Sequence, residues 1–159
     1  MIRLNVYWKG LLLLALLGCG VGCDGGGAKR DAQYEQLVGT WEVLVLREGR
    51  TMLSRDVSLE LTFRGGDRRT YRLRHAPEQG DTTTVSGRVE LLGENTLSMS
   101  EGFSRPLVWT FTFDEPDDLP DSVQFRLASR WTGSTQEFLS VIGRSGTSQP
   151  IEMDLELRD

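Results

Sequence analysis

The chain has 159 residues, of which 38% are hydrophobic and 26% are charged. The length leaves room for one domain and excludes a second. The composition is that of a packed domain and excludes a disordered chain. The formal net charge is −5, with 23 acidic residues against 18 lysines and arginines. An acidic chain of this kind argues against nucleic acid as a partner.

The first residues have the layout of an export signal. Two basic residues, Arg3 and Lys9, precede an unbroken apolar run over residues 11–17, and Gly18-Cys19 follows as a small-residue processing site. Seven apolar residues are too few to span a bilayer. The run Leu16-Leu17-Gly18-Cys19 resembles a lipobox, the site at which bacterial lipoproteins are cleaved and acylated on cysteine.

The resemblance to a lipobox implies that residues 1–18 are a lipoprotein signal peptide and that Cys19 carries the lipid. Cys23 is the alternative, and an unlipidated secretory signal that ends near Gly22 is a third interpretation. Gly20 follows Cys19, whereas Asp24 follows Cys23. In lipoproteins of the enterobacterial type, an aspartate directly after the acylated cysteine retains the protein in the inner membrane. Acylation of Cys19 therefore predicts an envelope protein of the outer membrane, facing the periplasm or the cell surface.

The anchor region gives way to a helix. Residues 19–30 include three consecutive glycines and are predicted to form a flexible tether behind the lipidated cysteine. Asp31 is placed to N-cap a short helix that runs to Leu37 or Val38, with Gly39 at its C-terminal cap. A single domain over residues 31–159 follows.

After Gly39 the apolar period changes to two, which is typical of half-buried strands. Glycine-rich turns at residues 65–67 and 93–95 separate neighbouring segments, as hairpins require, and a third turn is predicted at residues 132–134. A less regular ninth strand is predicted over residues 137–142. The alternating segments are residues 41–45, 59–63, 71–75, 85–91, 97–99, 107–113, 123–127 and 151–157.

This pattern predicts an all-β fold and fits two architectures. An antiparallel up-and-down β-barrel of about eight or nine strands with a short N-terminal helix would close all strand edges. A two-sheet sandwich would show the same alternation.

The block Leu37-Val38-Gly39-Thr40-Trp41 favours the barrel. A short helix that leads into Gly-x-Trp at the first strand resembles the opening motif of lipocalins and of the bacterial lipocalin-like lipoproteins. The resemblance implies a meander barrel in which Trp41 plugs the closed end and Gly39 allows a sharp turn into the first strand. In the family an arginine of the last strand packs over this tryptophan, and Arg158 is the candidate here.

The inventory of reactive side chains predicts a protein that is not an enzyme. The chain has a single histidine, both of its cysteines lie in the first 23 residues, and no catalytic, metal or cofactor motif is present. We therefore expect no catalytic residue, no metal site, no disulfide and no cofactor. The inward residues favour instead a candidate pocket for a small apolar ligand, lined by Tyr71, His75, Met99, Trp109, Phe111 and Phe125.

Two functions follow. The first is a lipid-anchored carrier that buries a small apolar molecule inside the barrel. The second is a packed barrel that binds envelope proteins or glycans through its outer loops at residues 114–121 and 143–150. An arginine stripe could meet anionic headgroups or glycans, or could simply be a solvated face, and it comprises Arg64, Arg68, Arg69, Arg72 and Arg74.

Overall fold

The structure is a computed structural model that describes residues 25–55, 58–114, 120–146 and 149–158. The predicted signal peptide and both cysteines, Cys19 and Cys23, lie outside the described residues. No helix in the described part of the chain is long and apolar enough to cross a membrane.

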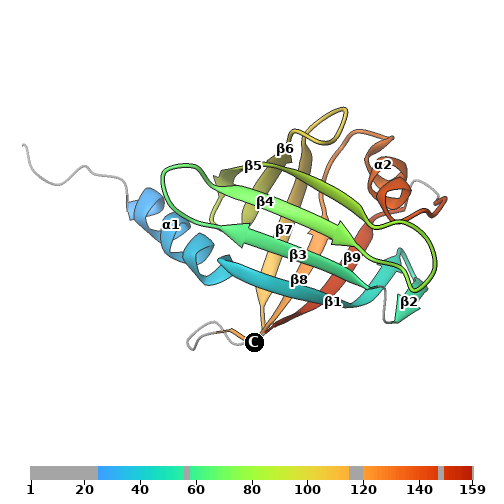
Figure 1. Ribbon diagram of the computed structural model, residues 1–159. Helices are drawn as coiled ribbons and strands as arrows, with labels where there is room; N and C mark the ends of the chain where they lie inside the picture. The colour runs from blue at the N-terminus through green and yellow to red at the C-terminus, as the bar shows by residue number, and fades with distance from the viewer. Residues whose placement is uncertain (1–24, 56–57, 115–119, 147–148, 159) are drawn as a thin grey trace, which may run out of the picture.

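The described residues form nine antiparallel strands and two helices, α1 before the first strand and α2 before the last (Figure 1). The strands lie in the order β2-β1-β3-β4-β5-β6-β7-β8-β9, and β1 also pairs with β9. This last pairing closes an eight-stranded up-and-down barrel, with β2 as an extra strand on β1, and excludes the sandwich. The elements are α1 (Gly25–Leu37), β1 (Gly39–Glu48), β2 (Thr51–Arg55), β3 (Leu59–Arg64), β4 (Thr70–His75), β5 (Thr83–Gly93), β6 (Thr96–Ser100), β7 (Leu107–Phe113), β8 (Ser122–Leu127), α2 (Ser134–Val141) and β9 (Ile151–Leu157).

The alternation of residue types sets the two faces of the sheet. In β3, Leu59, Leu61 and Phe63 are buried, whereas the residues between them are partly exposed. Period-two burial of this kind places one set of side chains inside the barrel and the other in solvent. The eight alternating segments of the sequence correspond to the eight barrel strands, so the predicted all-β barrel with its N-terminal helix is confirmed.

One strand departs from strict alternation. The pairing of β1 with β9 shifts between Val43 and Val45. As a result Leu44 is exposed and Leu46, rather than the expected Val45, is fully buried. An extra residue in one strand changes the face on which the following side chains lie.

The segment predicted as a ninth strand is a helix. Residues 137–142 belong largely to α2, and the turn at residues 132–134 leads into this helix instead of a hairpin. Phe138, Leu139 and Ile142 are buried, a spacing that also fits one face of a helix. Short apolar runs do not distinguish strand from helix by periodicity. The actual extra strand is β2, which continues the edge of β1 beyond β3.

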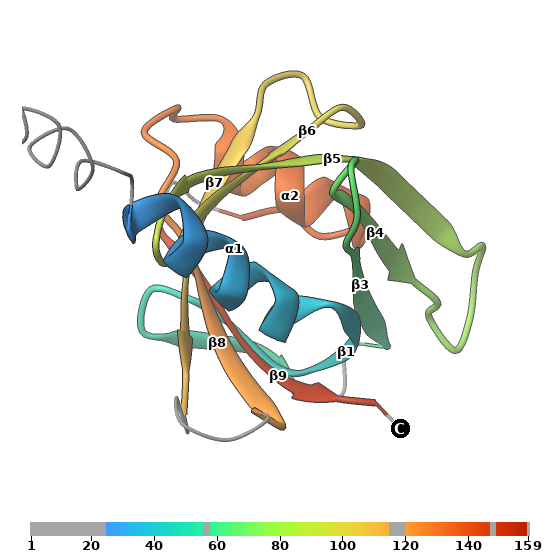
Figure 2. The ribbon, with the colours of Figure 1, turned by 90° about the vertical axis from the view of Figure 1, so that its left-hand side faces the viewer.

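The helix α1 lies across one end of the barrel, and α2 lies towards the other end (Figure 2). The helix α1 begins at Gly25, so residues 25–30, predicted as part of the tether, are helical. Its first turns contain glycines that favour other conformations, but Lys29 forms an ion pair of 2.8 Å with Glu94. Tyr34 and Leu37 are fully buried against the barrel. Tertiary contacts therefore outweigh weak helix propensity here.

Candidate functional site

Five of the six predicted pocket residues lie inside the barrel and pack into its core. Tyr71, Met99, Trp109, Phe111 and Phe125 are each no more than 2% exposed. Their positions agree with the period-two pattern of β4, β6, β7 and β8.

The aromatic rings in this core contact one another. Phe125 lies at the centre, with ring-centroid distances of 5.7 Å to Phe63, 5.8 Å to Phe111 and 6.3 Å to Trp109. Phe138 of α2 extends the cluster, 5.1 Å from Trp109. Contacts of this kind are typical of a close-packed protein interior.

Two buried tryptophans differ in the partners of their indole nitrogens. Trp41 Nε1 donates a hydrogen bond of 2.8 Å to the Leu37 carbonyl at the end of α1. Trp109 Nε1 is buried and has no acceptor among the described residues. A buried donor without an acceptor costs about 1–3 kcal/mol, so an acceptor at Trp109 would be stabilising.

Trp41 is fully buried and lies against the end of α1, through its bond to the Leu37 carbonyl. Gly39 starts β1 at a φ of 153°, and a Cβ there would lie 2.9 Å from Leu157 Cδ1. Arg158 forms an ion pair with Glu60 instead of packing over Trp41. At the α1 end of the barrel it is Arg69 that lies over an aromatic ring, 5.2 Å from the ring centroid of Tyr34.

Tyr34 fastens α1 to the turn between β3 and β4. Its hydroxyl donates a hydrogen bond of 2.9 Å to the Arg64 carbonyl, and Arg69 above its ring forms an ion pair of 2.7 Å with Asp31. Burial raises the pKa of Tyr34 to about 12, against the opposing charge of Arg69.

His75, the sixth predicted pocket residue, lies apart from the aromatic cluster. It ends β4 and is partly exposed, opposite Leu59 and Thr83 in the register. Partial burial, and secondarily the charge of Arg144, lower the pKa of His75 below its usual value of 6.5. His75 is therefore neutral over the physiological range.

We expect a matching pH dependence at His75. Its pKa is lower in the folded chain than in the unfolded chain, so protonation favours unfolding, and stability decreases as the pH falls below about 6.5. Because this is the single histidine of the chain, its ring protons can be followed by NMR without ambiguity. We expect the titration of the ring to have its midpoint below pH 6.5, and this midpoint to return part of the way towards 6.5 in Arg144→Gln. A midpoint at or above 6.5 in the unsubstituted chain would contradict the prediction.

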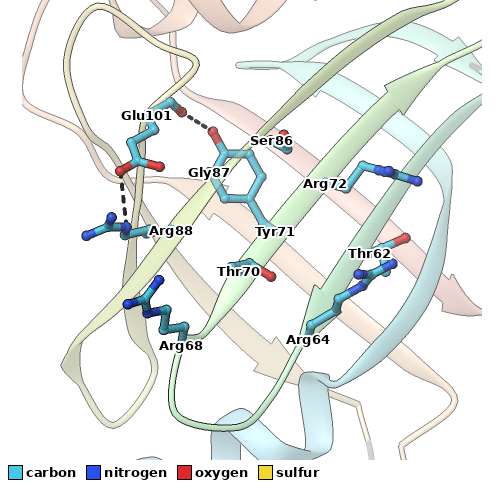
Figure 3. Close-up of a pocket in the computed structure, with 10 residues that line it drawn as sticks. All are labelled: Thr62, Arg64, Arg68, Thr70, Tyr71, Arg72, Ser86, Gly87, Arg88 and Glu101. Carbon is cyan, nitrogen blue, oxygen red and sulfur yellow. Dashed lines mark hydrogen bonds and ion pairs between the residues drawn. The ribbon is translucent and has the colours of Figure 1, made fainter.

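A second site, on the outer face of β3, β4 and β5, is rich in arginine (Figure 3). It is a pocket of about 390 Å³. Arg64 and Arg72 extend on one side of β4, and Arg68 and Arg88 on the other. The remaining lining residues are Thr62, Thr70, Tyr71, Ser86, Gly87 and Glu101.

Strand register explains how the arginines come together. Thr62, Arg72 and Ser86 form one row across the three strands, and Arg64, Thr70 and Arg88 form another row, two residues along each strand. Residues two apart share a face of a strand. Hydroxyl groups and guanidinium groups therefore alternate across the outer face.

The arginine stripe of the sequence separates into two groups. Arg69 and Arg74 form ion pairs with Asp31 and Glu60. Arg64, Arg68 and Arg72 form no ion pair with any residue that the structure describes. The sequence does not single out Ser86, Arg88 and Glu101, although the alternation of β5 indicates that the first two face outward.

The edge of this pocket is fixed by the chain at Glu101. Tyr71 donates a hydrogen bond of 2.5 Å to the Glu101 carbonyl, and the Glu101 carboxylate lies 3.1 Å from Arg88 Nε. Burial, with the nearby charges of Glu101 and Glu137, raises the pKa of Tyr71 above its usual value. The Tyr71 hydroxyl therefore stays protonated and keeps its hydrogen bond to the Glu101 carbonyl.

Comparisons with protein-family models, curated proteins and solved structures give no match to this chain. The resemblance to lipocalin-like lipoproteins accordingly stays a prediction based on Gly39, Trp41 and the order of the strands.

Proposed function

We propose that the protein is a non-enzymatic, lipid-anchored lipoprotein of the bacterial cell envelope, similar to the lipocalin-like lipoproteins. In this proposal its barrel is a packed scaffold that binds its partners on the outer surface. The lipobox-like run ending at Cys19 supports the anchor, with the outer membrane as its location. The aromatic cluster around Phe125 supports the packed scaffold.

The aromatic cluster is the observation that carries this proposal. A carrier must leave space for its ligand, and ligand pockets of this class measure about 300–1,000 Å³. The rings of Phe63, Trp109 and Phe111 each lie against that of Phe125, and all four side chains are buried. Their mutual contacts favour side chains over a ligand as the filling of an eight-stranded barrel.

Native mass spectrometry of the full chain tests both parts of the proposal. The protein would be expressed in a bacterium, released from membranes in a neutral detergent and exposed to a lipid extract. We expect the mass of a chain that begins at Cys19 and carries acyl groups, with no further stoichiometric adduct. Cys19→Ser should abolish acylation, whereas the matched Cys23→Ser should not.

A second candidate function, the carrier of a small apolar ligand, is favoured by Trp109. Its buried Nε1 has no acceptor among the described residues, and a ligand with one polar atom could supply an acceptor there. In that case a noncovalent adduct would accompany the purified chain and would be weakened in Trp109→Phe. Such an adduct would contradict the packed scaffold.

A further inference from the structure

We infer that the arginine pocket on β3, β4 and β5 binds a phosphate group, and that in the anchored protein this phosphate belongs to an anionic lipid headgroup. The membrane part of this inference rests on the proposed lipid anchor. The phosphate part rests on the geometry and charge of the pocket alone.

The pocket has an excess of positive charge. Four arginines and one carboxylate line the pocket, and this carboxylate, of Glu101, is already paired with Arg88. Arg64, Arg68 and Arg72 are exposed and unpaired among the described residues. The chain as a whole has a net charge of −5. A local excess of positive charge on an acidic protein attracts anions to this place in particular.

The hydrogen-bond donors of the pocket are arranged in a way that suits a phosphate group. Arg72 lies between Thr62 and Ser86, and Thr70 lies between Arg64 and Arg88. The oxygens of a phosphate could therefore receive hydrogen bonds from guanidinium groups and from neighbouring hydroxyls. Guanidinium forks match phosphate oxygens in pairs, and such charge-assisted bonds are about twice as strong as neutral ones.

The backbone at the floor of the pocket is closely packed. Gly87 lies opposite Tyr71 in the register, and the chain at Ser100 and Glu101 approaches it so closely that a Cβ would be 1.9 Å from the Ser100 carbonyl oxygen. Tyr71 holds the same segment through its hydrogen bond to Glu101. These contacts fix the backbone that carries Arg88 and Glu101 at the edge of the pocket, so this backbone does not have to be ordered when an anion binds.

The pocket lies close to the helix that follows the proposed lipid anchor. The turn between β3 and β4 packs on α1, through the bond from Tyr34 to the Arg64 carbonyl and the ion pair of Arg69 with Asp31. The helix begins at Gly25, six residues after Cys19. Six residues span at most about 20 Å. The anchor would therefore hold this end of the barrel near the headgroups, where basic residues are attracted to anionic lipid.

The test measures arginine reactivity. The full chain, purified from membranes, would be placed in phosphatidylcholine nanodiscs with or without phosphatidylglycerol, treated with phenylglyoxal and analysed by peptide mass spectrometry. We expect Arg64, Arg68 and Arg72 to react several-fold more slowly in the anionic nanodiscs, and Arg126, on β8, to react equally in both. Equal rates at the pocket arginines in the two nanodiscs would overturn the membrane assignment.

A second arm separates a lipid headgroup from a free phosphate compound. Glycerol 1-phosphate would be titrated into the chain in neutral detergent. Loss of one charged hydrogen-bond partner should weaken binding about tenfold. We therefore expect the affinity for glycerol 1-phosphate to fall by at least this factor in the double variant Arg64→Gln/Arg72→Gln. The matched Arg74→Gln/Arg126→Gln, which removes the same charge from arginines that already form ion pairs, should bind normally.

The outcomes can be distinguished. Binding of glycerol 1-phosphate without protection in anionic nanodiscs would keep the phosphate site and overturn its lipid source. Absence of both effects would overturn the whole inference, because all four substituted arginines are surface residues whose loss should not prevent folding. An unacylated chain in the mass spectrum would instead refute the proposed anchor while the titration still reported on the pocket.

Discussion

Replacement of Phe125 by alanine should lower the free energy of unfolding by about 3–5 kcal/mol, the usual cost of truncating a buried aromatic ring. Phe125 is fully buried and contacts Phe63, Trp109 and Phe111. It lies on β8, which is paired with β7 on one side and β9 on the other. These two pairings prevent the strand from collapsing into the space that the ring leaves, so most of the cavity should persist.

Chemical denaturation followed by circular dichroism measures this loss. Phe113→Ala is the matched control, because Phe113 also faces the ring of Phe111, at 5.6 Å, but is only partly buried; it should cost less than half as much. If the interior is packed, benzene should stabilise Phe125→Ala and leave the unsubstituted chain unchanged, since an apolar cavity of this size binds such ligands. A cost below about 1 kcal/mol for Phe125→Ala would mean loose packing, and would favour the carrier.

The fold could be predicted well because the barrel depends on a local signal. Eight segments alternate in period two, and each of them is a strand of the barrel. The failures occur where a local signal is ambiguous or is outweighed. The apolar run around Phe138 fits either a strand or a helix, the bulge at Leu44 changes the inward phase of β1, and tertiary contacts extend α1 through glycines that the sequence indicates as a tether.

The site was harder to predict because it depends on pairing between distant residues. Alternation places Trp109, Phe111 and Phe125 inside the barrel, but it contains no information on whether their rings touch one another or a ligand. The stripe of arginines is visible in the sequence. Which arginines are free is not, since Arg69 is occupied by Asp31 of α1, 38 residues away, and Arg74 by Glu60 across the strand pair.

Gly87→Ala should be the most damaging substitution at the outer pocket. A Cβ at this position would lie 1.9 Å from the Ser100 carbonyl oxygen and 2.8 Å from the Glu101 carbonyl oxygen. Both neighbours are backbone atoms, so no change of rotamer can relieve the overlap, and the chain at the end of β6 must move away from β5. Overpacking costs about 1–3 kcal/mol; because backbone has to move here, we expect a loss at the upper end of this range, measured by thermal unfolding.

Gly93→Ala, on the same strand, is the control. There the nearest atoms to a new Cβ are those of Thr96, at 3.6 Å, so the change in stability should stay within about 1 kcal/mol.

In Gly87→Ala, displacement of Glu101 should also release Tyr71 from its hydrogen bond and separate Arg88 from the Glu101 carboxylate. The pKa of Tyr71 should then decrease towards its usual value as solvent reaches the ring, which ultraviolet difference spectroscopy detects. Equal stability of the two alanine variants would mean that the chain at Glu101 does not close over Gly87, and the pocket would lose its fixed edge.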